Sequence, residues 1–278
     1  MTNTINMKKC FVMGLPEAGK TTYIAALSYV LLNSSASVLR IKELVGDSTY
    51  FSEMSSKWSN VEKLPRTLPA TERINNEFRL INNQGDELAL IIPDLSGESF
   101  QEQYINRTIK TDHAELIKEC MGILFFLNPD NIIEATLISK LSTTIRSGEE
   151  VKTRNAKDHD LTQVQLVDLL QFISYLRDGR PLRLCVIVSA WDVIEVRNKK
   201  PKPEEFIQKR VPLLWQFIKS NSHIFEENYF GVSAQGGKLE DAEKLLGNID
   251  ACDRIQVVDK DGNISKDITL PINWLMDT

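Results

Sequence analysis

The sequence predicts an α/β fold with a mostly parallel sheet and helices on both faces. Three continuous apolar runs without alternation stand at 122–127, 182–189 and 228–233, which is the pattern of strands that are covered on both sides. Between them, the segments 166–176 and 204–218 carry apolar residues at three and four spacing, a period typical of amphipathic helices. This alternation of strands and helices favours a parallel sheet between two helical layers.

The first third of the chain supplies the first strand, the first helix and a hairpin. The short apolar run over 10–13 stops at Gly14, and an apolar, helix-like segment follows over 21–32. The segments EFRLI at 77–81 and ELALII at 87–92 flank NNQGD, which has the composition of a hairpin turn. We therefore expect this pair of strands to be antiparallel.

The segments between these elements are more polar. Residues 33–72 contain Ser, Asn and Pro and have weak periodicity, and residues 98–119 are polar with a mostly helical pattern. Pro212 either interrupts the helix over 204–218 or begins a new helix there.

Length and charge bear on domain organisation and exclude several classes of protein. The chain has 278 residues, a formal net charge of −5 and a pI near 5.4, so one large domain fits and no uniform positive field is available for nucleic acid or an anionic membrane. The cysteines and histidines lack metal-site spacing, and no signal peptide, membrane span or lipid anchor is evident. We expect a cytoplasmic, soluble single domain over 1–278, with an exposed polar insertion near 147–161 and a C-terminal extension over 250–278 as candidate partner surfaces.

The strongest functional signal is a phosphate-binding motif between the first strand and the first helix. Gly14-Leu-Pro-Glu-Ala-Gly19-Lys20-Thr21 matches the pattern GxxxxGK[ST]. Its glycines let backbone N–H groups turn inward around phosphate oxygens, and the helix that starts at Lys20 points its positive dipole end at the same anion. In this pattern Lys20 reaches the β- and γ-phosphates and Thr21 binds Mg²⁺. The alternative is a glycine-rich strand-to-helix turn without a ligand.

A second motif follows the hairpin. The sequence LALIIPDLSGE, residues 88–98, is an apolar strand that ends in Asp94, with Gly97 three residues later. We expect Asp94 to hold Mg²⁺ through a water molecule and the Gly97 N–H to read the γ-phosphate, so that this loop senses the nucleotide state. The alternative is a strand-ending aspartate in an ordinary turn.

Two further motifs end later strands and point to guanine. VIVSAWD, residues 186–192, closes a buried strand with Asp192. In a guanine-specific site, a carboxylate at this place accepts two hydrogen bonds from the edge of the base, whereas adenine lacks that donor pair. Backbone amides in the turn 232–235, Val-Ser-Ala-Gln, are placed to bond the guanine oxygen. Asn128-Pro-Asp130 also ends a strand at the ligand-binding edge, where it either lines the site or forms a simple loop.

Together, the four motifs resemble those of a known class of nucleotide hydrolases. The series GLPEAGKT, DLSGE, SAWD and SAQ is similar to the G1, G3, G4 and G5 motifs of P-loop GTPases of the translation-factor-related class, which includes Ras-like and Arf-like proteins. It most closely resembles the prokaryotic double-GTPase family linked to conflict and defence gene neighbourhoods, through GLPEAGKTTYIAAL, DLSGESF and the late LPINWL at 270–275.

The resemblance implies a fold and an activity. The fold is a P-loop NTPase three-layer α/β/α sandwich, a Ras-like G domain whose mostly parallel sheet has one antiparallel strand. The activity is that of a molecular switch that binds GTP or GDP with Mg²⁺, hydrolyses GTP slowly and meets an unidentified protein effector or regulator. The implied nucleotide contacts are Gly14, Glu17, Ala18, Gly19, Lys20, Thr21, Thr22, Gly97, Ser189, Trp191, Asp192, Ser233 and Ala234.

Two positions depart from the family pattern. Ser189 and Ala190 stand where [NT]K is usual, and the missing lysine removes an aliphatic stem that packs over the base. Glu98 stands where Ras-like proteins carry the water-orienting glutamine; a carboxylate there positions water or acts as a base, or else slows hydrolysis by facing the γ-phosphate charge. The resemblance assigns catalysis to Lys20 and Glu98.

The threonine of the first switch loop must come from residues 34–72. LPRTLPATE offers Thr67 and Thr71, both upstream of the hairpin, and we favour Thr67 because Arg66 beside it is able to contact phosphate oxygens. The predicted Mg²⁺ ligands are Thr21, Thr67 and Asp94.

Two other functions are compatible with parts of the pattern. An ATP-dependent phosphotransferase or ATPase also has a P-loop, although such enzymes lack the DxxG and SAxD series. A nucleotide-bound interaction module with little turnover is compatible with Ala190 and Glu98. Comparing the binding of fluorescent GTP with that of ATP distinguishes the first alternative from a GTPase switch. Measuring phosphate release over many turnovers distinguishes the second alternative from it.

Overall fold

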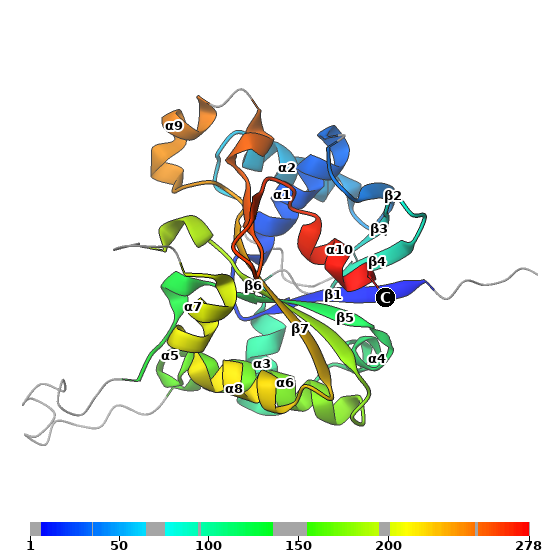
Figure 1. Ribbon diagram of the computed structural model, residues 1–278, viewed down its shortest axis with the longest axis vertical. Coiled ribbons are helices and arrows are strands. Elements are labelled where there is room, and N and C mark those ends of the chain that lie inside the picture. Colours follow the sequence, from blue (N-terminus) through cyan, green and yellow to red (C-terminus); the bar gives the residue numbers. More distant parts are fainter. Residues whose placement is uncertain are drawn as a thin grey trace, which may run out of the picture.

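A computed structural model of the chain describes residues 7–34, 36–64, 76–93, 96–135, 155–194, 201–247 and 250–277. Within these residues, nine strands form one mixed sheet in the order β2-β3-β4-β1-β5-β6-β7-β8-β9 (Figure 1). The predicted α/β class is therefore confirmed. The strands are β1 Lys8–Gly14, β2 Arg40–Val45, β3 Asn76–Ile81, β4 Glu87–Ile92, β5 Gly122–Leu127, β6 Leu182–Val188, β7 Phe225–Ser233, β8 Gln256–Val258 and β9 Ile264–Ser265.

Helices cover both faces of this sheet (Figure 1). Along β1, the side chains of Cys10 and Val12 join the core under one helical layer, and those of Phe11 and Met13 join the core under the other, because successive side chains of a strand point to opposite faces. Helices α1, α2 and α10 pack into the first core, and α3, α4, α6, α7 and α8 into the second. The helices are α1 Lys20–Asn33, α2 Ser48–Ser59, α3 Glu98–Asn106, α4 Thr111–Glu119, α5 Ala156–His159, α6 Thr162–Leu176, α7 Pro203–Arg210, α8 Pro212–Ser220, α9 Ala242–Leu246 and α10 Leu270–Met276.

The sheet has a parallel centre and antiparallel flanks. Strands β4, β1, β5, β6 and β7 pair in parallel, while β3 runs against β4 and β8 runs against β7. The prediction of one antiparallel strand is therefore wrong, because β8 and β9 continue the sheet beyond β7 as a second antiparallel flank. The predicted hairpin is confirmed as β3 and β4. None of the described helices has the length and apolar character needed to cross a membrane.

The polar segment over 33–72 contains two elements that its weak periodicity did not predict. Asp47 caps α2 by accepting a hydrogen bond from the Tyr50 N–H at 3.0 Å, as residues at this position commonly do. The helix buries Phe51, Met54 and Trp58, which are spaced by three and four residues. These three large side chains decide the helix despite its polar composition.

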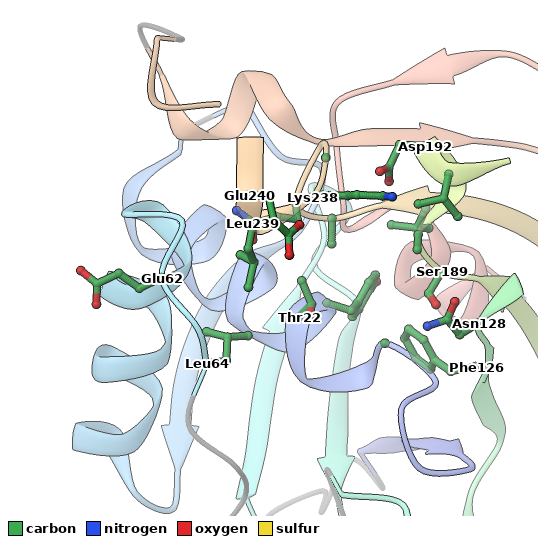
Figure 2. A pocket seen from close by; sticks show the side chains of 18 residues that line it. Thr22, Glu62, Leu64, Phe126, Asn128, Ser189, Asp192, Lys238, Leu239 and Glu240 are labelled. Atoms are coloured by element: carbon green, nitrogen blue, oxygen red, sulfur yellow. The ribbon is translucent and has the colours of Figure 1, made fainter. Parts of the chain in front are cut away.

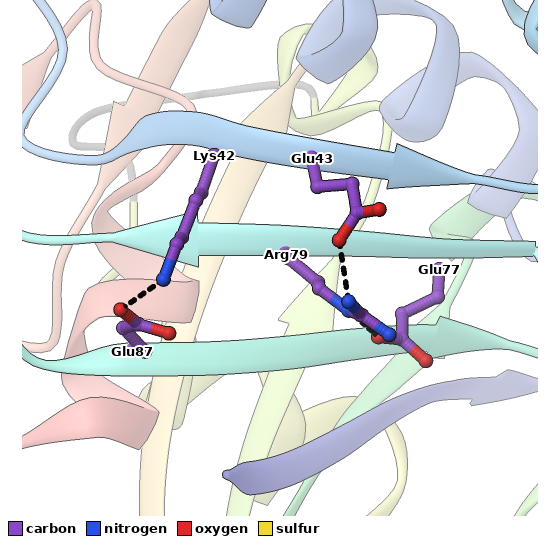
Figure 3. A network of polar contacts seen from close by, with 5 residues as sticks. All are labelled: Lys42, Glu43, Glu77, Arg79 and Glu87. Atoms are coloured by element: carbon purple, nitrogen blue, oxygen red, sulfur yellow. Dashed lines mark hydrogen bonds and ion pairs between the residues drawn. The ribbon is translucent and has the colours of Figure 1, made fainter.

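Strand β2 forms one edge of the described sheet and carries charges. A register shift between Ile41 and Glu43 marks a β-bulge, and ion pairs cross the face of β2, β3 and β4 (Figure 3). Arg79 pairs with both Glu43 and Glu77, and Lys42 pairs with Glu87. Exposed pairs of this kind contribute little stability, but a bulge and charges at an edge oppose pairing with another strand.

Two helical predictions are refined. The segment 98–119, expected to be mostly helical, forms two helices, α3 and α4, and the break falls at Arg107, whose φ is 57°. Pro212 begins α8 directly after α7 ends at Arg210, which agrees with the preference of proline for the first turn of a helix.

Most of the predicted insertion near 147–161 lies outside the described residues. Its described end forms α5, and Asp160 beyond that helix is buried, with the Tyr104 Oη donating to its Oδ2 at 2.6 Å. The expectation of an exposed segment is therefore wrong at Asp160.

The C-terminal segment 250–277 is part of the sheet and its cover. Helix α10 buries Ile272 and Leu275 against the sheet, and a Cβ added at Gly122 of β5 would lie 2.8 Å from Leu275 Cδ2. This segment therefore completes one face of the core.

We predict that Leu275→Ala lowers the free energy of unfolding by about 2–4 kcal/mol, because a fully buried leucine is replaced by a cavity. Chemical denaturation measures the change. Ile264→Ala is the matched control, because the Ile264 side chain is 68% exposed in β9, and it should change the free energy by less than about 0.5 kcal/mol. Equal, small effects of both changes would contradict the placement of α10 in the core.

Candidate functional site

The loop between β1 and α1 closes around the side chain of Lys20. Lys20 is 2% exposed, and its Nζ donates to the carbonyl oxygens of Gly14 at 2.9 Å and Leu15 at 2.8 Å. Gly19, with a φ of 88°, is the N-cap of α1, so the first turn of this helix directs its backbone N–H groups toward the loop. A buried ammonium at a helix N-terminus is the arrangement that receives phosphate.

The other predicted contacts of this loop surround the same place. Glu17 is exposed and has a φ of 59°, while Ala18 is buried and its N–H donates to the Leu15 carbonyl at 3.3 Å. Thr21 and Thr22 are half-buried in the first turn of α1. The loop and the turn therefore form one continuous surface at the carboxyl end of β1.

The second motif lies against the Lys20 ammonium. Gly97 is the N-cap of α3 with a φ of 79°, and a Cβ added there would lie 2.5 Å from Lys20 Nζ and 2.6 Å from the Gly14 oxygen. Only glycine fits this position. Glu98 begins α3 with its side chain exposed, while Asp94 lies outside the described residues.

The predicted metal ligands are only partly described. Thr21 stands in the first turn of α1, where its hydroxyl is on the same turn as Lys20, but Thr67 and Thr71 lie outside the described residues, as Asp94 does. In the described part of the chain, no group of three or more His, Cys, Asp or Glu side chains is arranged to hold a metal ion. Thr21 is thus the one predicted ligand whose position is known.

The third motif contacts the loop between β1 and α1 through Ser189. Its backbone N–H donates to the Leu127 carbonyl at 2.9 Å, and its hydroxyl donates to the same oxygen at 3.3 Å. A Cβ added at Gly19 would lie 2.5 Å from Ser189 Oγ. Ser189 therefore packs directly against the start of α1.

Asp192 and the fourth motif meet at the end of β7. Ser233 is 1% exposed, and its hydroxyl donates to Asp192 Oδ1 while accepting a hydrogen bond from the Gly236 N–H at 3.1 Å. Asp192 lies in the short 3₁₀ helix Trp191–Val193, which follows Ala190 in the left-handed conformation. One carboxylate oxygen is thus held by Ser233, which fixes the orientation of the other.

The ring of Trp191 does not line the pocket that these residues form. It is fully buried, packs edge-on to Phe206 with ring centres 5.9 Å apart, and lies so close to Gly231 that a Cβ there would be 2.2 Å from its Cδ2. The ring belongs to the core under α7, so the predicted nucleotide contact of Trp191 stays a prediction for its backbone.

A pocket of about 380 Å³ lies between the start of α1 and the ends of β5, β6 and β7 (Figure 2). Its volume falls within the usual range for small-molecule sites. Figure 2 shows Thr22, Ser189 and Asp192 on elements that are far apart in the sequence but face the same hollow. Predicted contacts in its lining are Gly19, Thr22, Ser189, Asp192 and Ala234.

Other residues of the lining were not predicted as contacts. Asn128, at the end of β5, was left open between a lining residue and a simple loop, and it lines the pocket. Glu62 and Leu64 follow α2, and Lys238 to Glu240 follow the fourth motif (Figure 2). Only Asn128 carried a signal in the sequence, namely its place at the carboxyl end of a buried strand.

The turn after β7 is supported from behind. The Ala234 carbonyl accepts a hydrogen bond from Trp58 Nε1 at 3.1 Å, and Arg254 donates to the Trp58 carbonyl at 2.9 Å. Tyr23, which lines the pocket, donates to the Ile268 carbonyl at 2.8 Å. Burial raises the pKa of Tyr23 well above its usual value, so its hydroxyl is a neutral donor at physiological pH.

The comparison with protein families agrees with this geometry. The model of a family described as Double-GTPase 1 matches residues 11–275, a range that runs from β1 into α10 and includes all four motifs. No curated protein matches the chain.

Proposed function

Because the chain belongs to the Double-GTPase 1 family, we propose that it binds GTP and GDP with Mg²⁺, hydrolyses GTP slowly and acts as a nucleotide-dependent molecular switch. The observation that supports this most is the position of the pocket: Gly19 and Thr22, on either side of Lys20 at the start of α1, line it at one place, and Asp192 lines it at another. A phosphate group and a base at these two places correspond to one nucleotide.

The phosphate end is assigned to Lys20, the backbone N–H groups of the loop and Gly97. The ammonium neutralises phosphate charge, and the N–H groups that begin α1 add a fixed positive field. Thr21, with Asp94 and Thr67, would hold Mg²⁺, which supplies further neutralisation of the phosphate charge when bound. Positioning and charge neutralisation are the means of catalysis in this proposal.

The switch is assigned to the loop before α3. Gly97 lies beside the Lys20 ammonium and is the N-cap of α3, so a γ-phosphate bound by Lys20 would lie beside the start of that helix. Its presence or loss would change the surface that α3 offers to a protein effector or regulator.

The sequence resemblance to conflict-associated GTPases extends the proposal to a prokaryotic defence system. Protection of cells against phage by the wild-type chain, and its loss in a Lys20→Ala strain, is the corresponding measurement.

We expect Lys20→Ala to weaken GTP and GDP binding by roughly tenfold to a hundredfold or more, because a charge-assisted contact to phosphate is lost. Titration of fluorescent GTP measures the affinity, and a melting curve checks the fold. Lys42→Ala removes an exposed lysine far from the pocket and should leave the affinity unchanged. Unchanged GTP affinity in a folded Lys20→Ala variant would contradict the assignment.

Glu98→Ala should slow hydrolysis more than it weakens GTP binding, since we assign this carboxylate to the attacking water. Single-turnover phosphate release gives the rate. Glu102→Ala, an exposed carboxylate one turn further along α3, is the control. A normal rate in Glu98→Ala would remove Glu98 from catalysis, and a wild-type chain that binds GTP without turnover would be an interaction module instead.

Asp192→Asn should weaken GTP binding and strengthen XTP binding, because the new amide opposes a guanine donor but meets the extra carbonyl of xanthine. We expect a shift of about 1–3 kcal/mol between the two nucleotides. Competition of GTP, ATP and XTP against a fluorescent guanine nucleotide measures it for wild type and variant together. Equal binding of ATP and GTP by wild type, with no XTP gain in the variant, would withdraw the guanine assignment.

A further inference from the structure

Two asparagine side chains hold a single carbonyl of the phosphate-binding loop. The Nδ2 atoms of Asn128 and Asn131 donate to the Glu17 carbonyl oxygen at 3.0 Å and 3.1 Å. Asn128 directly follows β5, and Asn131 ends the 3₁₀ turn Pro129–Asn131. The strand next to β1 in the sheet thus reaches across to fix one peptide of the loop.

Glu17, whose carbonyl belongs to that peptide, has an energetically unfavourable backbone conformation. Glu17 has a φ of 59°, in the left-handed region that side chains other than glycine rarely adopt. Such a conformation persists where the surroundings hold it in place. The hydrogen bonds that Asn128 and Asn131 donate to the Glu17 carbonyl hold this conformation in place.

The carbonyl determines where the next N–H points. In a trans peptide the C=O and N–H bonds point in opposite directions, so a Glu17 carbonyl held outward by the asparagines directs the Ala18 N–H into the loop. There this N–H donates to the Leu15 oxygen at 3.3 Å, the same oxygen that accepts from Lys20 Nζ at 2.8 Å. Two donors therefore converge on one acceptor, and a phosphate oxygen is an acceptor of the same kind.

The asparagines are themselves fixed. Asn128 Oδ1 accepts a hydrogen bond from the Asp130 N–H at 3.1 Å, and the Asn131 carbonyl accepts one from Thr162 Oγ1 at 3.3 Å. The same Thr162 hydroxyl accepts from the Ile133 N–H at 2.8 Å. The turn after β5 is thereby tied to the first residue of α6, which gives the two amides a rigid base.

We propose that Asn128 and Asn131 are positioning residues for nucleotide phosphate: through the Glu17 carbonyl they aim the Ala18 N–H at the place where Lys20 meets the diphosphate. The inference rests on the proposed function and adds to it two residues outside the four motifs. Asn131 is the cleaner of the two, since it is exposed and does not line the pocket around Asp192, whereas Asn128 does.

The test compares two ligands, GDP and guanosine, by calorimetry or competition. Asn131→Ala should weaken GDP binding by about fivefold and the Asn128→Ala, Asn131→Ala double variant by about tenfold or more, which corresponds to the loss of one and two hydrogen bonds. Guanosine, which has no phosphate, should bind Asn131→Ala as it binds wild type. Asn33→Ala is the matched control, because the Asn33 amide also donates to a carbonyl, that of Tyr29 at 2.9 Å, at the far end of α1.

Each result decides the inference. The inference is overturned if the double variant binds GDP within twofold of wild type. If the double variant does not fold, the GDP affinity of the Asn131→Ala variant decides the inference by itself. Equal losses for GDP and guanosine in Asn131→Ala also overturn it, because the asparagine then acts on the whole pocket. A wild-type chain that binds no GDP overturns the proposed function first, which distinguishes that failure from this one.

Discussion

A buried ammonium group must have acceptors, and the arrangement of this site follows from that requirement. Lys20 meets it with the carbonyls of Gly14 and Leu15, which forces the loop after β1 to fold back over its own lysine. The backbone can follow that path only where side chains are absent, and Gly19 and Gly97 leave the necessary space. The path of the loop, the start of α1 and the position of the second motif all follow from keeping the charge of Lys20 out of water.

The parallel centre of the sheet brings the remaining groups to the same edge. Strands β5, β6 and β7 end beside the pocket, so Asn128, Ser189 and Ala234, which directly follow them, line the same hollow although about a hundred residues separate the first from the last. Asn128 and Ser189 donate to backbone carbonyl oxygens, and Ser233 donates to Asp192 Oδ1. The pocket is thus shaped before any ligand enters, which lowers the cost of binding.

Much of this could be predicted from the sequence, and the exceptions have physical causes. Continuous apolar runs identified the buried strands, and glycine spacing identified the loop between β1 and α1. Helix α2 was missed because only Phe51, Met54 and Trp58 carry its burial within a polar segment. The sequence left the direction of the Trp191 ring open, and the structure places it in the core beside Phe206. The hydrogen bonds from Asn128 and Asn131 to the Glu17 carbonyl depend on the position of β5 beside β1. No local sequence pattern shows which strand lies beside β1.

The packing of α10 against β5 makes the order of synthesis matter. Residues 250–277 leave the ribosome after every parallel strand has been made, yet Leu275 of α10 covers Gly122 of β5, which was made much earlier. Until then, the apolar face beneath α10 stays open to water and to other chains. A chain of this design therefore exposes apolar surface for a longer part of its translation than one whose core closes from the N-terminus, and exposed apolar surface favours aggregation.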